Sequence, residues 1–543
     1  MEHFRCFDYI IVGAGSAGCV LADRLTENGK YSVLILEFGG TDRDIEIQIP
    51  AGLAGPMNKP KYDWGYWTEA EPGLNGRKIH QARGKVIGGS SSINGMVYVR
   101  GHREDFEEWE RLGAVGWGYQ QCLPYFKRAE GSVYEPDEYR GTNGPLGTCN
   151  GNNMNNPLYR AFIQAGIQAG YMATQDYNGL QQEGFGRMDM TVKGGVRAST
   201  ANAYLKPALR RQNLTLETNA LMNKLTFDGR QCTGVEYQKK GTRRIVKANK
   251  EVILSAGAFG SPHILMLSGI GAPSNLRAFD VEVLHELPGV GENLQDHLEI
   301  WIQQACVKPI TLASAFNPFS RFFIGLQWML FKTGLGATNH FEACGFIKSQ
   351  PEILYPDIQF HFLPAAMAYN GSSQVLEHGY QVHVGHNKPK SRGNIRLKSN
   401  DPLEKPRLFF NYLDDEKDRE GFRACVHLSR KIFSQAAFDS FRGREIAPGP
   451  DVCNDDDIDH WVAQNAETAY HPACSCKMGT DNMAVVDPSC RVRGINGLRV
   501  VDSSIMPTIT NGNLNAPTIM IAEKAADMIL DRAPLEAINS PSF

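Results

Sequence analysis

The pattern of apolar and polar positions is most regular in the first forty residues of the chain. An apolar run, Tyr9–Val12, stops at a glycine, which is typical of a buried parallel strand. Apolar residues then recur at helical spacing over 17–25, and a second apolar run, Ser32–Leu36, ends at Glu37. The pattern predicts a strand, a loop, a helix and a second strand, in that order, with an acid directly after the second strand.

Beyond residue 40 the pattern is irregular as far as residue 80, and residues 300–465 alternate short strands and helices. The β runs between residues 214 and 248 predict a meander that returns the chain toward the first strands, and 251–255 predicts one more buried strand. The last helix is predicted to run from Asn515, with Pro517 in its first turn, to Leu530. Helical patterns also cover 102–130, 157–169 and 200–212.

The aromatic stretch Phe316–Phe331 has two interpretations. We expect a helix that packs on a sheet, and the alternative is a helix that lies with one face on a membrane surface. No run in the chain approaches the roughly 18 uninterrupted apolar residues of a membrane-spanning helix.

The loop after the first strand carries the spacing G-x-G-x-x-G at Gly13, Gly15 and Gly18, with Ser16 inside it. Gly13 permits a tight turn, Gly15 lets the main chain approach a pyrophosphate, and Gly18 lets the helix lie close to the strand. Glu37, nineteen residues past Gly18, is placed to accept hydrogen bonds from a ribose. The unit predicts a site for the ADP moiety of NAD or FAD.

Composition narrows the class of protein. A chain of 543 residues predicts two domains of unequal size. A net charge of −3 without a basic stripe argues against a nucleic-acid partner. The 12 cysteines are scattered, and Cys474 and Cys476 form the only close pair, so we expect neither a disulfide framework nor a metal site. Because the first strand begins about seven residues in, we expect no signal peptide and a cytoplasmic location.

Small residues gather in two further stretches, Gly84–Asn94 and Gly257–Gly271, and suit close approach of the main chain to a flat or charged ligand. Both stretches match the signatures of the glucose–methanol–choline (GMC) flavoprotein oxidoreductases, and the resemblance covers nearly the whole chain. It implies an α/β fold with a Rossmann-like FAD-binding domain and an α+β substrate-binding domain of sheet and helices. The expected FAD-binding domain comprises 1–155, 213–300 and 466–543, and the expected substrate-binding domain comprises 156–212 and 301–465.

The resemblance also implies how FAD is held. Some relatives attach the flavin covalently through a histidine, but Ile93 stands at that place here, so we expect non-covalent FAD. Asn94 and Gly95 are expected beside the isoalloxazine, and Asp502 beside the ribityl and phosphate portion. The other implied contacts are Gly13, Gly15, Ser16, Gly18, Glu37, Gly88, Gly89, Ser91 and Met222.

The family oxidises an alcohol by passing a hydride to flavin N5, and a base must take the hydroxyl proton. His471, in Tyr-His-Pro, matches the family's histidine, and its unperturbed pKa near neutrality suits a base. Asn515 matches the partner position, where His or Asn holds the alcohol oxygen. The resemblance therefore implies His471 and Asn515 as the catalytic pair.

Within the family the chain most resembles the members that oxidise choline to betaine aldehyde, a step of glycine betaine biosynthesis. A quaternary ammonium is best bound by an aromatic cage with a carboxylate. Trp64 matches a cage tryptophan, which Tyr470 and Phe362 are placed to join. His361 resembles a substrate-contact histidine and equally fits a strand histidine in the core.

The carboxylate of the cage is not placed by the pattern. An ungapped alignment puts Ala305 at that position, and Glu299 and Glu342 are the alternatives. Two other activities therefore stay open, oxidation of neutral aliphatic or aromatic primary alcohols and an FAD-containing hydroxynitrile lyase. For the oxidation we expect a quinone or another respiratory electron acceptor, together with peripheral contact with the inner membrane.

Overall fold

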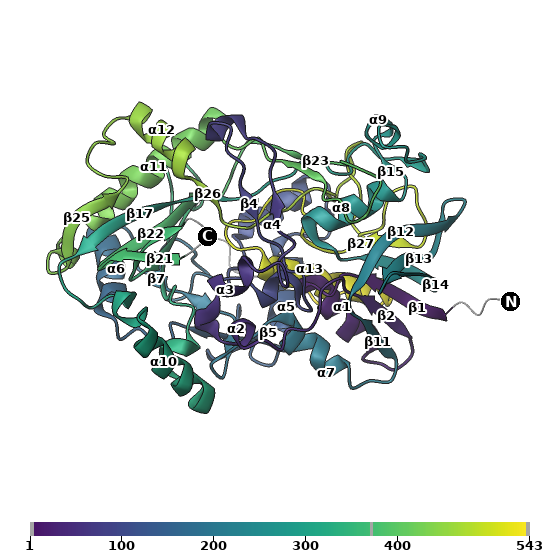
Figure 1. Cartoon of the computed structure of the whole chain (residues 1–543), viewed down its shortest axis with the longest axis horizontal. Coiled ribbons are helices and arrows are strands. Elements are labelled where there is room, and N and C mark those ends of the chain that lie inside the picture. Colours follow the sequence, from purple (N-terminus) through teal and green to yellow (C-terminus); the bar gives the residue numbers. More distant parts are fainter. Residues whose placement is uncertain (1–4, 370–372, 539–543) are drawn as a thin grey trace.

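The computed structural model describes residues 5–369 and 373–538, which form two large β-sheets with helices between and around them (Figure 1). The first sheet is built on the unit predicted from the N-terminal pattern: β1 (Arg5–Val12) pairs in parallel with β2 (Val33–Leu36), and α1 (Ser16–Thr26) connects them. All four residues of β2 are buried, as expected for a central parallel strand. The strand order is β11-β2-β1-β14-β13-β12, and β27 pairs with β14.

The meander is formed by β12 (Ala220–Asp228), β13 (Gln231–Lys239) and β14 (Thr242–Leu254). The first predicted β run is not part of it, because β11 (Leu214–Glu217) pairs in parallel with β2. The buried strand predicted at 251–255 is the end of β14, which lies parallel to β1. One long strand thus belongs to both the meander and the parallel part of the sheet, which β27 (Leu498–Val500) completes.

Helices from distant parts of the chain cover this sheet. α1 packs against α13 (Asn515–Ile529), which begins at the predicted residue, and α13 contacts α5 (Tyr119–Ala129). α8 (Gly257–Leu267) follows β14 directly, so the stretch 257–271 opens a helix at the same sheet edge at which α1 follows β1. The helix predicted over 200–212 forms only as a π-helical turn, η4 (Ala201–Leu205), and the short α7 (Lys206–Ala208).

The second sheet is antiparallel, with the order β25-β17-β22-β19-β18-β7, and lies on the left in Figure 1. The predicted domain boundary at residue 300 falls inside β17, and β26, in the predicted FAD-binding segment, pairs with β17. α6 (Pro157–Gln168) and α11 (Glu416–Phe433) pack on this sheet. Its strands are β7 (Gly184–Arg187), β17 (Leu298–Cys306), β18 (Ala343–Ile347), β19 (Ile358–Leu363), β22 (Gly379–His386), β25 (Arg442–Ala447) and β26 (Glu467–Thr468).

The aromatic stretch forms α10 (Pro318–Phe331), but the expected packing on a sheet is wrong. Its main contacts are with two short turns, η5 (Leu312–Ala315) and η6 (Gly334–Ala337), and Trp328 is its only buried side chain. In the part of the chain that the structure describes, no helix combines the length and apolar character needed to cross a membrane.

The remaining elements are short or peripheral. The helices are α2 (Ile45–Gln48), α3 (Ala54–Met57), α4 (Arg103–Arg111), α9 (Pro273–Arg277) and α12 (Asp455–Asn465). The strands are β3 (Tyr66–Trp67), β4 (His80–Gln81), β5 (Glu130–Ser132), β6 (Leu146–Asn150), β8 (Asp189–Met190), β9 (Val192–Lys193), β10 (Val196–Arg197), β15 (Ile270–Gly271), β16 (His285–Glu286), β20 (Ala366–Tyr369), β21 (Ser373–Glu377), β23 (Asn394–Arg396) and β24 (Arg407–Phe409).

Candidate active site

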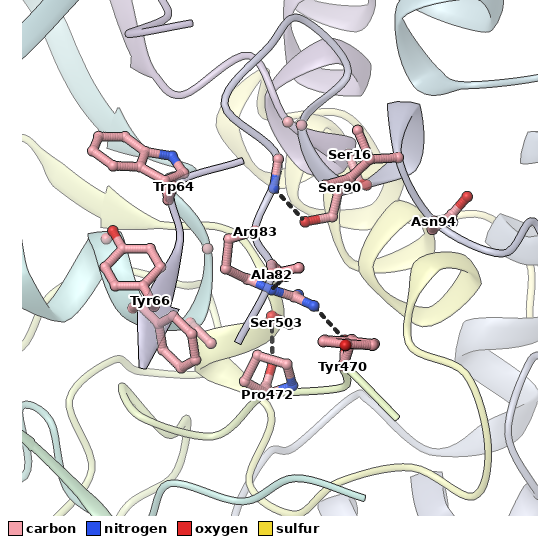
Figure 2. Close-up of a pocket in the computed structure, with 18 of the residues that line it drawn as sticks. Ser16, Trp64, Tyr66, Ala82, Arg83, Ser90, Asn94, Tyr470, Pro472 and Ser503 are labelled. Carbon is pink, nitrogen blue, oxygen red and sulfur yellow. Dashed lines mark hydrogen bonds between the residues drawn. The ribbon is translucent and has the colours of Figure 1, made fainter. Parts of the chain in front are cut away.

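A cavity of about 380 Å³ is lined by residues of both sheets. One end is formed by the loop between β1 and α1 and by Glu37 after β2. The other end is formed by side chains of β17, β19 and β22 and by the loops that hold His471 and Asn513. Figure 2 shows the part between them, where Ser16, Ser90 and Asn94 lie on one side and Trp64 and Tyr66 on the other.

Glycines shape the first end as the sequence predicts. Gly13 has a φ of +101°, and a Cβ at Gly18 would lie 1.9 Å from the carbonyl oxygen of Gly13, so only glycine lets α1 lie this close to β1. At Gly15 the nearest atoms to a Cβ would be 3.9 Å away, and at Gly95 and Gly257 none would lie within 4 Å. These three glycines line the cavity and expose main chain to it, which fits the close approach of a dinucleotide and a flat ring system.

Two buried carboxylates border the cavity near these loops. Glu37 accepts hydrogen bonds from the N–H groups of Ala14 (3.0 Å) and Gly39 (2.7 Å), and burial raises its pKa to about 7. Asp502 accepts from the N–H of Gly257 (2.9 Å), and burial raises its pKa as well. Each acid therefore holds a glycine-rich loop in place while it faces the cavity.

Most of the predicted cofactor residues line the cavity. Gly18 and Gly88 are the exceptions, because they lie behind its wall and set the course of the main chain, with a φ of +86° at Gly88. The Oγ of Ser91 donates to the carbonyl of Gly88 (2.6 Å), which fixes the turn. The predicted residues that line the cavity are Gly13, Gly15, Ser16, Glu37, Gly89, Ser91, Asn94, Gly95, Met222 and Asp502.

Arg197 is a buried residue that the sequence analysis missed. Its Nη1 donates to the carbonyl oxygen (2.6 Å) and to Oδ1 (2.9 Å) of Asn94, and its Nε donates to the carbonyl of Ile47 (2.7 Å). Burial lowers the pKa of Arg197 to about 9. The guanidinium thus orients Asn94 from behind the cavity wall, and nothing in the local pattern around residue 197 signals this contact.

His471 lies at the other end of the cavity, in a chain of hydrogen bonds that sets its tautomer. The carbonyl of Asn387 can only accept, so Nε2 of His297, 3.0 Å away, carries a proton. Nδ1 of His297 is then an acceptor for Nδ1–H of His471 at 3.2 Å. Nε2 of His471 is left without a proton and accepts from the side-chain amide of Asn513 at 3.0 Å. Burial, with His297, His361 and Arg83 adding to it, lowers the pKa of His471 well below its usual value.

The prediction of Asn515 as the partner of His471 is wrong by two positions. Asn513 contacts the imidazole, whereas Oδ1 of Asn515 accepts from the Oγ of Ser16 at 2.8 Å. Asn515 is the first residue of α13, and its side chain points toward the start of α1. The turn before the helix sends the side chain of Asn513 in a different direction, and the Asn-Leu-Asn spacing cannot distinguish the two amides.

The loop that carries His471 is held by a buried acid whose role the sequence analysis did not assign. Oδ1 of Asp296 accepts from the main-chain N–H of His471 (2.8 Å), and Oδ2 accepts from the hydroxyls of Tyr412 (2.5 Å) and Thr468 (2.6 Å). Asp296 and His297 are adjacent in the Leu-Gln-Asp-His motif. In Figure 2, Arg83 reaches the same loop and donates to the carbonyl of Tyr470 (2.6 Å).

A charged and aromatic group lines the same cavity as His471. Glu299 accepts from Nε1 of Trp301 (3.0 Å) and pairs with Nδ1 of His383 (2.9 Å). Burial works to raise the pKa of Glu299, but His383 and His361 outweigh it and hold that pKa below its usual value. Nε2 of His361 lies 3.4 Å from Oδ1 of Asn513. The cavity therefore has an ionised carboxylate next to the histidines.

Some of the other predicted substrate-binding residues line the cavity and some do not. Trp64 and Tyr470 line the cavity, and Trp64 stacks on Tyr66 with ring centroids 5.8 Å apart. Phe362 does not, because β19 alternates and turns it away from His361 into the core, where it stacks on Phe162. Neither Ala305 nor Glu342 lines the cavity, and the carboxylate of Glu342 instead accepts from Thr338.

Comparisons with known proteins agree with this geometry. Residues 7–299 match the family model of the N-terminal part of the GMC oxidoreductases, and residues 389–522 match that of the C-terminal part. A protein of Photobacterium profundum named oxygen-dependent choline dehydrogenase is 57% identical over 99% of this chain and 95% of its own length. A protein of the same name from Brucella suis is 53% identical over 98% of this chain and 97% of its own length.

Solved structures show the same architecture. Pyridoxine 4-oxidase from Mesorbium loti has a TM-score of 0.89 and 32% identity, and the match covers 97% of this chain and 99% of that one. An Aspergillus oryzae formate oxidase, a variant studied for FAD modification, has a TM-score of 0.91 and 25% identity, with coverage of 97% and 98%. With both family models matched in order around a cavity that suits a dinucleotide, the chain belongs to the GMC oxidoreductase family.

Proposed function

We propose that this enzyme oxidises choline to betaine aldehyde. The observation that carries the proposal is Glu299, a carboxylate kept ionised in a cavity whose wall also contains Trp301 and Trp64. A quaternary ammonium group cannot donate a hydrogen bond, so it is bound by aromatic faces and a nearby negative charge. A cavity built for a neutral alcohol has no use for such a charge, because burying it costs free energy.

The enzyme is an FAD-dependent oxidoreductase that acts on alcohols, as GMC oxidoreductases are. The residues present fit the cofactor: exposed main chain at Gly15, Gly95 and Gly257 suits the pyrophosphate and the ring, and Glu37 suits the ribose. When bound, the flavin supplies an acceptor for the hydride that leaves the alcohol carbon. Ile93, at the place of covalent attachment in some relatives, offers no nucleophilic atom, which supports a non-covalent flavin.

His471 is proposed to take the hydroxyl proton at Nε2. The hydrogen bonds from His471 to His297 and from His297 to the carbonyl of Asn387 hold the proton on the far side of each ring, so Nε2 keeps its lone pair, which accepts from Asn513 here and can accept the hydroxyl proton when substrate is bound. The amide N–H₂ of Asn513, 3.0 Å from Nε2, is placed to donate to the same alcohol oxygen as negative charge develops on it. A positioned base of this kind contributes about 10² to 10⁴ in rate.

The test compares choline with 3,3-dimethylbutan-1-ol, which has the same shape without the charge. In Glu299→Gln, we expect kcat/KM for choline to fall about 10²-fold or more, since removing one member of a close buried charge pair costs about 2–5 kcal/mol. The value for the neutral alcohol should change little. Glu342→Gln is the matched control, because it removes a buried acid that does not line the cavity.

Two outcomes would contradict the proposal. One is that the wild-type enzyme does not reduce its flavin with choline under anaerobic conditions, while it does so with aliphatic or benzylic alcohols. The other is that Glu299→Gln slows both substrates equally, since the carboxylate would then serve the fold and not the ammonium group. Flavin reduction by any alcohol would itself exclude a pure hydroxynitrile lyase.

We also propose that a quinone or another respiratory carrier reoxidises the flavin, with peripheral contact at the inner membrane. Dioxygen is the competing candidate for the electron acceptor, because similar proteins are named oxygen-dependent choline dehydrogenase. Turnover with choline should be measured with a water-soluble quinone under nitrogen and with air alone. A rate in air equal to the quinone rate would contradict this part of the proposal.

A further inference from the structure

The helix α10 presents an apolar stripe to solvent. Its exposed apolar side chains recur at positions i, i+3, i+4, i+7 and i+11, which is the spacing of one helix face. Trp328, the buried residue, lies on the opposite face, and its indole N–H donates to the carbonyl of Gly195 (2.6 Å). The stripe consists of Phe319 (74% exposed), Phe322 (64%), Phe323 (50%), Leu326 (36%) and Leu330 (63%), with Met329 (56%) beside it.

This arrangement is unlike that of an ordinary surface helix, whose apolar stripe faces the core. Figure 1 shows α10 at the margin of the molecule, on the side of the second sheet and remote from β1 and β2. None of its residues lines the cavity, so the stripe is not the wall of the active site. Exposed apolar groups gathered on one projecting helix mark an interaction surface.

The charged residues near the stripe indicate what kind of partner it binds. Between Glu299 and Glu342 the sequence has no Asp or Glu, and its cationic residues are Lys308, Arg321 and Lys332. Arg321 is exposed, whereas the ammonium of Lys332, directly after α10, lies 3.7 Å from the ring centroid of Trp328, on the face away from the stripe. The whole chain has a net charge of −3, so this cationic segment differs from the rest of the surface. Aromatic and aliphatic side chains with flanking cations are the composition of a helix that lies in a membrane interface.

We propose that α10 docks the enzyme on an anionic lipid surface, with its apolar stripe among the acyl chains and with Arg321 at the headgroups. A helix of 14 residues is about 21 Å long and lies in the interface without crossing the bilayer. The proposal rests on the peripheral membrane contact proposed above and assigns it to one helix outside the catalytic cavity, and it does not depend on which alcohol the enzyme oxidises.

The test is sedimentation of the full-length, FAD-loaded enzyme with vesicles of phosphatidylcholine alone and with vesicles that contain about one third phosphatidylglycerol. We expect binding to the anionic vesicles that weakens with salt. The double variant Phe322→Glu with Leu330→Glu should bind at least about tenfold more weakly, because it removes two apolar anchors and adds two negative charges. Arg321→Gln should weaken binding about fivefold.

Leu354→Glu is the matched control, since Leu354 is 86% exposed and lies outside α10. It should bind vesicles like the wild type. All variants should keep their flavin and their rate with a water-soluble alcohol and acceptor, which separates loss of docking from misfolding or from failure of the proposed choline activity.

Three outcomes would overturn the proposal. One is that the wild type sediments with neither kind of vesicle, as a protein without an interfacial helix does. Another is equal binding to vesicles with and without phosphatidylglycerol, which would show that Arg321 does not recognise anionic headgroups. A wild-type dimer in solution that the double variant converts to a monomer would assign the stripe to a second copy of the chain.

Discussion

The two ends of the cavity use different means of recognition. At the end next to β1, glycines expose main chain, and the carboxylates of Glu37 and Asp502 hold the loops. At the other end, side chains of Glu299, His471 and Asn513 provide charge, a base and a hydrogen-bond donor. Each main-chain contact needs only a short glycine-rich motif, whereas the side-chain group is assembled from residues as far apart in the chain as Glu299 and Asn513. Binding at the first end therefore depends on room for the ligand next to the main chain, and binding at the second end depends on the direction in which the side chains point.

The largest effect is expected at the main-chain end. In Gly18→Ala, the new Cβ would meet the carbonyl oxygen of Gly13 at 1.9 Å, so α1 has to move away from β1. We expect a loss of about 3 kcal/mol or more in the free energy of unfolding and loss of bound FAD. The checks are the thermal midpoint and the flavin absorbance of the purified protein.

Gly325→Ala is the control for this substitution, because no atom lies within 4 Å of a Cβ there. It should keep its flavin and unfold at the wild-type temperature or slightly above, since alanine favours the helix. Full flavin occupancy in Gly18→Ala with an unchanged thermal midpoint would show that the loop tolerates the extra atom, and the close-packing argument would fail.

A smaller effect, confined to the rate, is expected at the side-chain end. Asn513→Ala removes the donor next to His471, so the rate of anaerobic flavin reduction should fall about 10² to 10³-fold while flavin content stays constant. Asn515→Ala removes the hydrogen bond with Ser16 at the start of α13 and should slow reduction less than about tenfold. Stopped-flow reduction by substrate measures both, and the reverse order of the two variants would restore Asn515 as the catalytic partner.

The smallest effect is expected in the pH dependence of flavin reduction, which reports on the side-chain end of the cavity. Burial, with His297, His361 and Arg83 adding to it, lowers the pKa of His471, so its neutral form is retained down to pH values below 6.5. The rate of flavin reduction should be constant from about pH 9 to 6.5 and fall only under more acidic conditions, because the protonated imidazole cannot accept the substrate proton. A half-maximal rate at or above pH 6.5 would contradict the environment that we assign to His471.

The N-terminal unit could be predicted from the sequence because its physics is local. An apolar strand, a glycine loop and an amphipathic helix follow from residues close together in the chain, and the structure forms them where the pattern predicts. The same holds for the start of α13, where Asn515 and Pro517 occupy the first turn. The family signatures at 84–94 and 257–271 added the identity of the cofactor, which the glycine spacing alone left between NAD and FAD.

Three features could not be obtained in that way. The choice between Asn513 and Asn515 depends on the backbone of one turn, which rotates successive side chains apart. Glu299 became recognisable only because β17 brings it to the cavity beside His383, whereas Ala305 on the same strand lies away from it. The outward face of α10 reflects the tertiary packing of Trp328 against Gly195, which a periodic apolar pattern cannot indicate. Local pattern specifies an element and its period, but the direction of a side chain in space is set by contacts between segments that are distant in the chain.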